Sequence, residues 1–233
     1  TGVIMPVKEI CELRDRLAPQ AAIHVDGVQG YLRVPFSFKE TKADSYALSA
    51  HKIHGPKGVG ALVLADGGRI KPIMAGGGQQ GGLRSGTENT SGIAGMVAAV
   101  QSYPSDAMER MRGLKRLLLS LLTEALPETT VAGLPVDDPM SAGHILNVAF
   151  PPVRAETLLH ALEADGICVG TGSACSSKKG RRSPVLTAMH LPPQVMDSAI
   201  RMSLCPFNTE EEMRYTAEKI IERVGRLRRF TRR

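Results

Sequence analysis

The apolar residues of this 233-residue chain follow helical and extended patterns in alternation. Residues 8–18 predict a helix, because their apolar side chains recur at helical spacing at Ile10, Leu13 and Leu17. Residues 21–25 form a short apolar run that predicts a buried strand closing on Asp26. A helix followed by a strand with a polar residue at its end is typical of an α/β sheet, in which functional groups lie beyond the carboxyl ends of strands.

Two apolar runs within residues 45–64 predict a pair of strands joined by a turn, because a Gly- and Pro-rich HGPKG segment at 54–58 separates them. Lys52 lies just past the first apolar run, at the C-terminal end of the strand that this run predicts. A lysine held there and partly shielded from water can lose its proton near neutral pH and act as an amine nucleophile. A solvated loop lysine is the ordinary alternative, so Lys52 gains meaning only from its neighbours.

Glycine is densest in residues 74–90, which predict either an anion-cradling loop or a merely flexible one. Residues 91–102 are small and apolar and predict a buried helix. Residues 106–125 predict a long amphipathic helix. Its apolar stripe consists of Met108, Met111, Leu114, Leu118 and Leu121.

A change in composition around Pro104 predicts a domain boundary, which divides the chain into residues 1–103 and residues 104–233. Strands and helices alternate beyond it, as is typical of a smaller α/β or α+β domain. The predicted strands are 145–150, 167–169 and 199–204, and the predicted helices are 155–164, 185–189 and 209–226. The last helix begins in the manner of a capping box, with Asn208 or Thr209 as the cap and acids in the first turn.

Composition limits the classes of protein and of partner that are expected. The chain is 42% hydrophobic and 22% charged, and it has no apolar run of about 18 residues, so no transmembrane helix and no membrane partner are expected. Its four cysteines show no CxxC pairing and no metal-ligand spacing, which favours reduced thiols in a cytoplasmic protein and no metal site. A net charge of +6 suits an acidic partner or RNA but indicates neither, and direct nucleic-acid binding is not expected.

Asp26 and Gln29 are the first candidates for chemistry. An aspartate buried at a strand end needs a cationic or hydrogen-bonding partner, and a protonated pyridine ring supplies one. Aspartate together with a Schiff-base lysine is the pairing that pyridoxal phosphate enzymes use. Taken alone, Asp26 is more readily interpreted as a helix cap or a turn residue.

Cys175 is the second candidate and lies in residues 170–180, a loop of small polar residues with a basic end. Lys178 and Lys179 favour its thiolate electrostatically, and the glycines permit the loop to move. A loop thiol without a role is the alternative interpretation.

Four motifs together closely resemble the cysteine desulfurases, in the class V aminotransferase group of fold-type I pyridoxal phosphate enzymes. They are HVDGVQ at 24–29, SAHKIHGPKG at 49–58, RSGTEN at 84–89 and GSACS at 172–176. The lysine motif by itself is typical of the wider group. The GSAC motif narrows the resemblance to desulfurases of the branch that supplies sulfur to iron–sulfur scaffolds and tRNA thiolation.

The resemblance implies an α/β fold in two parts. Residues 1–103 would be the C-terminal part of the pyridoxal phosphate-binding large domain, with a mixed, mostly parallel sheet. Residues 104–233 would be the small α/β (α+β) domain that carries the cysteine loop. The family has a further N-terminal portion that contributes to the cofactor pocket and is not present in this sequence, so we expect the chain to be part of a longer enzyme.

Cofactor roles also follow from the resemblance. Lys52 would form the internal aldimine and later move protons, and Asp26 would keep the ring nitrogen protonated. Gln29 would hydrogen-bond the phenolic oxygen of the ring. Ser49 and His51 would bind the phosphate.

Three further residues would complete the site. Thr87 would reach the phosphate of the neighbouring subunit in a homodimer. Arg201 would pair with the carboxylate of L-cysteine, a surface salt bridge being its alternative role. Cys175 would accept sulfur as a persulfide and pass it to a sulfur-acceptor protein. The alternatives left open are another class V enzyme, such as a selenocysteine lyase or an aminotransferase, and an inactive truncated form that only binds partners.

Overall fold

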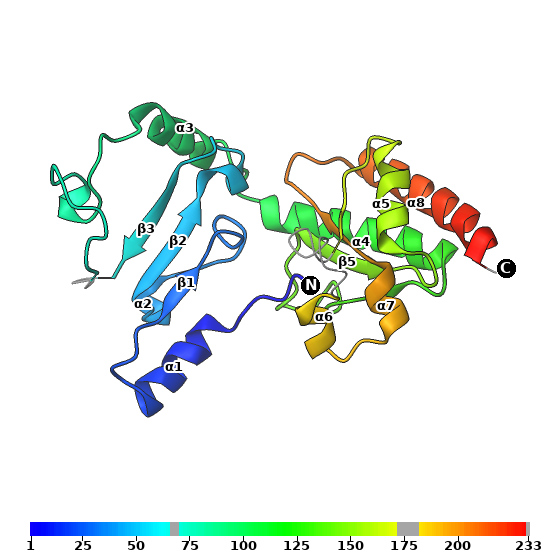
Figure 1. Cartoon of the computed structure of the whole chain (residues 1–233), viewed down its shortest axis with the longest axis horizontal. Helices are drawn as coiled ribbons and strands as arrows, with labels where there is room; N and C mark the ends of the chain where they lie inside the picture. The colour runs from blue at the N-terminus through cyan, green and yellow to red at the C-terminus, as the bar shows by residue number, and fades with distance from the viewer. Residues whose placement is uncertain (66–69, 172–181, 232–233) are drawn as a thin grey trace. The chain divides into compact units, whose positions relative to one another are not determined.

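The chain forms two compact units in the computed structural model (Figure 1). Met5–Pro104 makes up one, here called the N-terminal unit, and Thr1–Ile4 with Ser105–Arg233 makes up the other, the C-terminal unit. The division after Pro104 is adjacent to the boundary predicted after residue 103, although Thr1–Ile4 joins the C-terminal unit. The residues that the structure describes are 1–65, 70–171 and 182–231.

The N-terminal unit is built on a mixed three-stranded sheet of order β1-β2-β3. Strand β1 (His24–Asp26) runs parallel to β2 (Ser45–Ser49), and β2 runs antiparallel to β3 (Gly60–Leu64). The predicted α/β class with a mixed sheet is therefore confirmed, although parallel pairing does not predominate among the strands described here. The helices are α1 (Val7–Leu17), α2 (Phe38–Thr41), α3 (Thr90–Gln101) and the short 3₁₀ helices η1 (Ala50–Ile53) and η2 (Gln80–Gly82).

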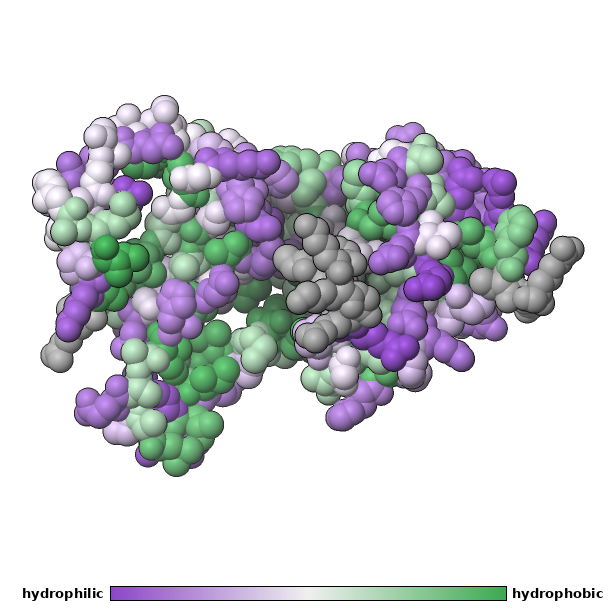
Figure 2. Space-filling model, in the orientation of Figure 1, coloured by the Kyte–Doolittle hydropathy of each residue, from purple (hydrophilic) through white to green (hydrophobic). Residues whose placement is uncertain are grey.

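Helix α1 exposes the apolar residues that predict it. Ile10, Leu13 and Leu17 are 40%, 45% and 75% exposed, and apolar surface is visible over α1 in Figure 2. The side of the helix that faces inward carries Cys11, which is 0% exposed. Arg14 donates hydrogen bonds to the main-chain oxygen of Ala21 (2.7 Å) and to Oδ2 of Asp44 (2.9 Å).

Two predictions of burial in this unit are wrong. Strand β1 covers His24–Asp26 instead of 21–25, and its two end residues are exposed. In the described sheet it is an edge strand that pairs with β2 alone. Helix α3 buries only Gly92. It contacts the loop after η1 through a narrow glycine face, where a Cβ on Gly92 would lie 2.4 Å from Val59. Of its other apolar residues, Met96, Ala99 and Val100 are half-buried and the rest are exposed.

The C-terminal unit has an antiparallel four-stranded sheet of order β4-β5-β7-β6. The strands are β4 (Thr130–Val131), β5 (Ile145–Ala149), β6 (Gly170–Thr171) and β7 (Ala199–Ser203). Helices α4 (Ala107–Ala125) and α8 (Glu210–Thr231) pack together (Figure 1). The remaining helices are α5 (Ala155–Glu163), α6 (Pro184–Ala188) and α7 (Pro193–Ser198). This unit, which corresponds to the predicted second domain, thus has an antiparallel sheet with helices.

The ends of α5 and α8 show how local signals set element boundaries. The strand predicted at 167–169 begins later, at Gly170, because the main-chain N–H of Ile167 donates to Leu162 (3.0 Å) and closes the end of α5. At the start of α8 the predicted capping box is present. Glu212 N donates to Thr209 Oγ1 (3.2 Å), and Thr209 N donates to Glu212 Oε2 (2.9 Å).

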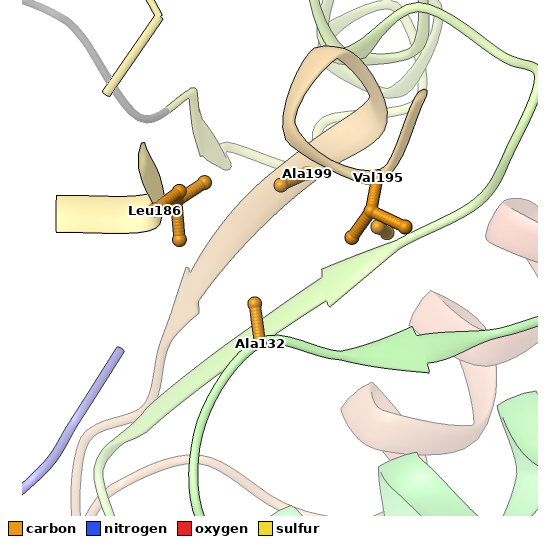
Figure 3. Close-up of a cluster of buried hydrophobic side chains, with 5 residues drawn as sticks. Ala132, Leu186, Val195 and Ala199 are labelled. Carbon is orange, nitrogen blue, oxygen red and sulfur yellow. The ribbon is translucent and has the colours of Figure 1, made fainter. Parts of the chain in front are cut away.

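Buried apolar side chains hold α6 and α7 on the sheet of the C-terminal unit. A small cluster combines residues after β4, in β5, in α6 and α7, and at the start of β7 (Figure 3). Its members are Ala132, Ala149, Leu186, Val195 and Ala199. Among the residues described, no helix is both long enough and apolar enough to cross a membrane.

Candidate active site

The carboxyl ends of β1 and β2 bring four of the predicted site residues to one edge of a sheet. Asp26 is the last residue of β1 and pairs with Ala47 of the parallel strand β2. Ser49 ends β2, and His51 and Lys52 follow at once in η1. Because β1 and β2 are parallel, their carboxyl ends lie at the same end of the sheet. Residues 26 and 49–52 are therefore found together there.

Lys52 is half-buried on a firmly anchored turn. Its neighbours Ala50 and Ile53 are 0% and 1% exposed, so η1 is packed into the unit on both sides of the lysine. Ala50 N donates to Val59 O (3.0 Å), and Gly55 N donates to Ala50 O (2.9 Å). The prediction that Lys52 lies between two strands, partly shielded from water, is confirmed.

Asp26 is exposed, where the sequence predicted the end of a buried strand. Its Oδ1 accepts a hydrogen bond from Val28 N (3.1 Å), which orients the carboxylate at the start of the following turn. Gly27 is required in that turn, because a Cβ there would lie 1.8 Å from Cζ of Tyr46. Asp26 therefore presents an open carboxylate on a constrained backbone.

Ser49 and His51 are joined through a contact of 2.8 Å between Oγ and Nδ1. His51 is exposed and Ser49 is half-buried, so both can offer polar groups at the sheet edge. Thr87 lies in the same unit, in the exposed segment between η2 and α3. Asn89, two residues on, caps α3 by accepting from Gly92 N (3.0 Å).

Arg33 is the residue that sequence reasoning missed. It is 6% exposed and donates hydrogen bonds to the Gln29 side chain and to the main-chain oxygen of Lys52. Gln29 itself is exposed in the turn after β1. No local pattern marks Arg33, because its partners at residues 52 and 103 are distant in sequence.

Arg201 belongs to the C-terminal unit, in β7, opposite Asn147 of β5 and Gly170 of β6. Its side chain is exposed and lies over the Gly170 backbone, where a Cβ would be 3.2 Å from Arg201 Nη2. Gly170 thus leaves room for the guanidinium.

Cys175 lies outside the described residues, as do Lys178, Lys179 and Arg181. Arg182, the next basic residue, is described and pairs with Asp197 (2.9 Å). The bidentate hydrogen bonds of Arg182 hold the pKa of Asp197 below its usual range.

Residues 1–215, which are most of the chain, match the family model of the class V aminotransferases. The chain belongs to the class V aminotransferase family.

Individual relatives make the match more specific. A cysteine desulfurase of Nostoc sp. is 36% identical over 232 residues and 98% of this chain. The cysteine desulfurase IscS of Methanosarcina thermophila is 36% identical over 99% of the chain. The chain spans 56% of the length of each of these relatives. A solved NifS-like protein is similar with a TM-score of 0.84 and 37% identity, over 97% of this chain and 58% of that one.

Proposed function

We propose that the protein is a pyridoxal phosphate-dependent cysteine desulfurase that converts L-cysteine to L-alanine. The observation that carries the proposal is a half-buried lysine on an anchored turn, at the same sheet edge as the Asp26 carboxylate. The relatives named cysteine desulfurases support this activity among the reactions of the family. In the proposal residues 1–103 belong to the cofactor-binding domain, and residues 104–233 to the small domain with the cysteine loop.

The residues at the sheet edge fit pyridoxal phosphate. Asp26 offers an exposed carboxylate to a protonated ring nitrogen, and Lys52 offers an amine for a covalent link. Ser49 and His51 offer polar groups to the phosphate. When bound, the cofactor supplies an electron sink that makes the α-proton of an amino acid acidic.

The residues of the chain divide the remaining work. Lys52 Nζ holds the cofactor and moves a proton to and from the substrate. Gln29 donates a hydrogen bond to the phenolic oxygen of the ring, and Arg201 pairs with the substrate carboxylate. Thr87 is proposed to contact the phosphate across a homodimer.

Cys175 is proposed to take the sulfur. Its thiolate attacks the sulfur of L-cysteine, so a sulfur–sulfur bond forms as the carbon–sulfur bond breaks. The freed β-carbon gains a proton and leaves as L-alanine, while the outer sulfur stays on Cys175 as a persulfide. An acceptor protein of iron–sulfur cluster assembly or tRNA thiolation is the proposed recipient.

The test uses purified protein with pyridoxal phosphate, L-cysteine and a thiol reductant, and it measures alanine and sulfide. Cys175→Ser is expected to abolish both products. Cys168→Ser is the matched control, because Cys168 is an exposed thiol a few residues before the loop. Full turnover by Cys175→Ser would exclude its role as the sulfur acceptor.

A second measurement addresses the lysine. Borohydride reduction followed by peptide mass mapping is expected to place the cofactor on Lys52, and Lys52→Arg is expected to remain unlabelled. Transfer to a 2-oxo acid instead of alanine release would indicate an aminotransferase. Strong preference for selenocysteine would indicate a lyase for that substrate.

A further inference from the structure

Arg33 is a buried cation that contacts two candidate site residues of the N-terminal unit, Gln29 and Lys52. It lies in the turn between β1 and α2 and is only 6% exposed. Its described hydrogen bonds all end on uncharged oxygens. A buried charge is costly unless its donors are satisfied, so the chain places acceptors around this guanidinium.

The acceptors come from three separate segments. Nη1 donates to Gln29 Oε1 (3.4 Å) and lies 3.5 Å from Gln29 O. Nη2 donates to the main-chain oxygen of Lys52, and Nε donates to Tyr103 Oη (3.2 Å). The Arg33 guanidinium therefore links the turn after β1 to the turn that holds Lys52 and to Tyr103, near the end of the N-terminal unit.

The contact with Gln29 determines which way its amide faces. A guanidinium has only donors, so Gln29 has to turn Oε1 toward Arg33. The amide NH₂ group is then left to donate elsewhere, and the Gln29 side chain is exposed. Arg33 thus fixes the orientation of the Gln29 side-chain amide, so that its NH₂ group is the one available to donate a hydrogen bond.

The contact with Lys52 acts on the backbone. His54 N and Gly55 N both close η1 by donating to Ala50 O. The carbonyl of Lys52 points instead to Arg33, which ties the middle of η1 to the rest of the unit.

We infer that Arg33 is a positioning residue that orients the Gln29 donor and the Lys52 turn toward the cofactor without touching the cofactor. The inference rests on the proposed function, because it assigns the work of Gln29 and Lys52 to pyridoxal phosphate. An oriented N–H donor stabilises the deprotonated phenolic oxygen of the ring and lowers the pH at which the absorbance of the bound cofactor changes.

The first experiment titrates the visible absorbance of the bound cofactor in four forms of the protein. Arg33→Met and Gln29→Ala are each expected to raise the midpoint by about 0.4 to 1 pH unit, the range for one lost hydrogen bond. The double variant is expected to shift the midpoint by less than the sum of the two single shifts, because part of the effect of Arg33 passes through Gln29. Arg14→Met, which removes a hydrogen-bonded arginine elsewhere in the same unit, is expected to leave the midpoint unchanged. An unchanged midpoint in Arg33→Met, or additive shifts in the double variant, would overturn the inference.

The second experiment needs no cofactor. Hydrogen exchange at the Gly55 amide reports opening of η1, and Arg33→Met is expected to speed it roughly tenfold, as for one net hydrogen bond. Arg33→Lys keeps the positive charge but lacks the branched guanidinium, so it is expected to give a smaller increase in the exchange rate. This variant replaces Arg33→Met in the experiment if the methionine variant does not fold. Unchanged exchange in both variants would contradict the role at Lys52. Failure of borohydride to label Lys52 in the unmodified protein would instead overturn the proposed function, whatever the exchange rates.

Discussion

Lys115 makes the stability of the C-terminal unit depend on pH in an unusual direction. It lies in α4, is 2% exposed, and donates to Ser141 Oγ (2.8 Å) and to Ala142 O (3.0 Å). Burial, helped by the charge of nearby Arg112, lowers the pKa of Lys115 from 10.5 to about 8. No carboxylate is among its described hydrogen-bond partners.

The sign of the effect follows from proton binding. Between pH 8 and pH 10.5 the unfolded chain keeps a proton on Lys115 that the folded chain has lost. The unfolded state therefore binds more protons, and the free energy of unfolding rises with pH across this window. At about 1.4 kcal/mol per pH unit, the total rise is about 3 kcal/mol, which is the cost of burying the charged amine at neutral pH.

Urea unfolding of the purified protein between pH 7 and pH 11 measures this rise against Lys115→Met. The difference in unfolding free energy between the two proteins is expected to move in favour of lysine by about 3 kcal/mol as the pH increases. Taking the difference cancels the other groups that titrate there. Parallel profiles of the two proteins would refute a buried lysine with a lowered pKa.

Three further substitutions test other local arguments. Gly27→Ala is expected to cost about 2 kcal/mol or more of stability in thermal unfolding, because its Cβ would lie 1.8 Å from the Tyr46 ring, and an unchanged melting temperature would contradict the packing. Gly170→Ala is expected to raise the KM for L-cysteine roughly fivefold with little change in kcat, because the new Cβ displaces Arg201 by a few tenths of an ångström. A loss confined to kcat would argue against that placement. Thr209→Ala is expected to cost about 1 kcal/mol in chemical denaturation by removing the cap of α8, whereas Thr209→Ser is expected to retain it.

The elements with strong local signals were predicted closely. The lysine turn and its two strands follow from apolar runs broken by glycine and proline, and β2 and β3 occupy the predicted places. The short elements β4, α2 and α7 escaped because a few residues carry little periodic signal. Burial was overestimated at β1 and α3, since apolar composition reports what a segment can bury and not which partner covers it.

The candidate site was predictable where it depends on strand order. Once β1 and β2 are parallel, Asp26 and the residues of η1 must lie at the same end of the sheet. Their places at predicted strand ends indicated Asp26 and Lys52, whereas the role expected of His51 came from the resemblance. The roles proposed for Thr87 and Arg201 rest on the resemblance alone, and that of Cys175 rests on the resemblance together with its basic neighbours in the sequence.

Two buried cations show where sequence reasoning reaches its limit. Lys115 follows Met111 by four residues and precedes Leu118 by three, so it lies on the apolar stripe of α4 and could have been identified as buried from spacing alone. Arg33 lies in a turn without periodicity, and its partners at Lys52 and Tyr103 meet it only after the sheet has formed. The burial of a charged residue inside an amphipathic helix can thus be predicted from sequence spacing, whereas the burial of one that joins separate segments is found only in the folded structure.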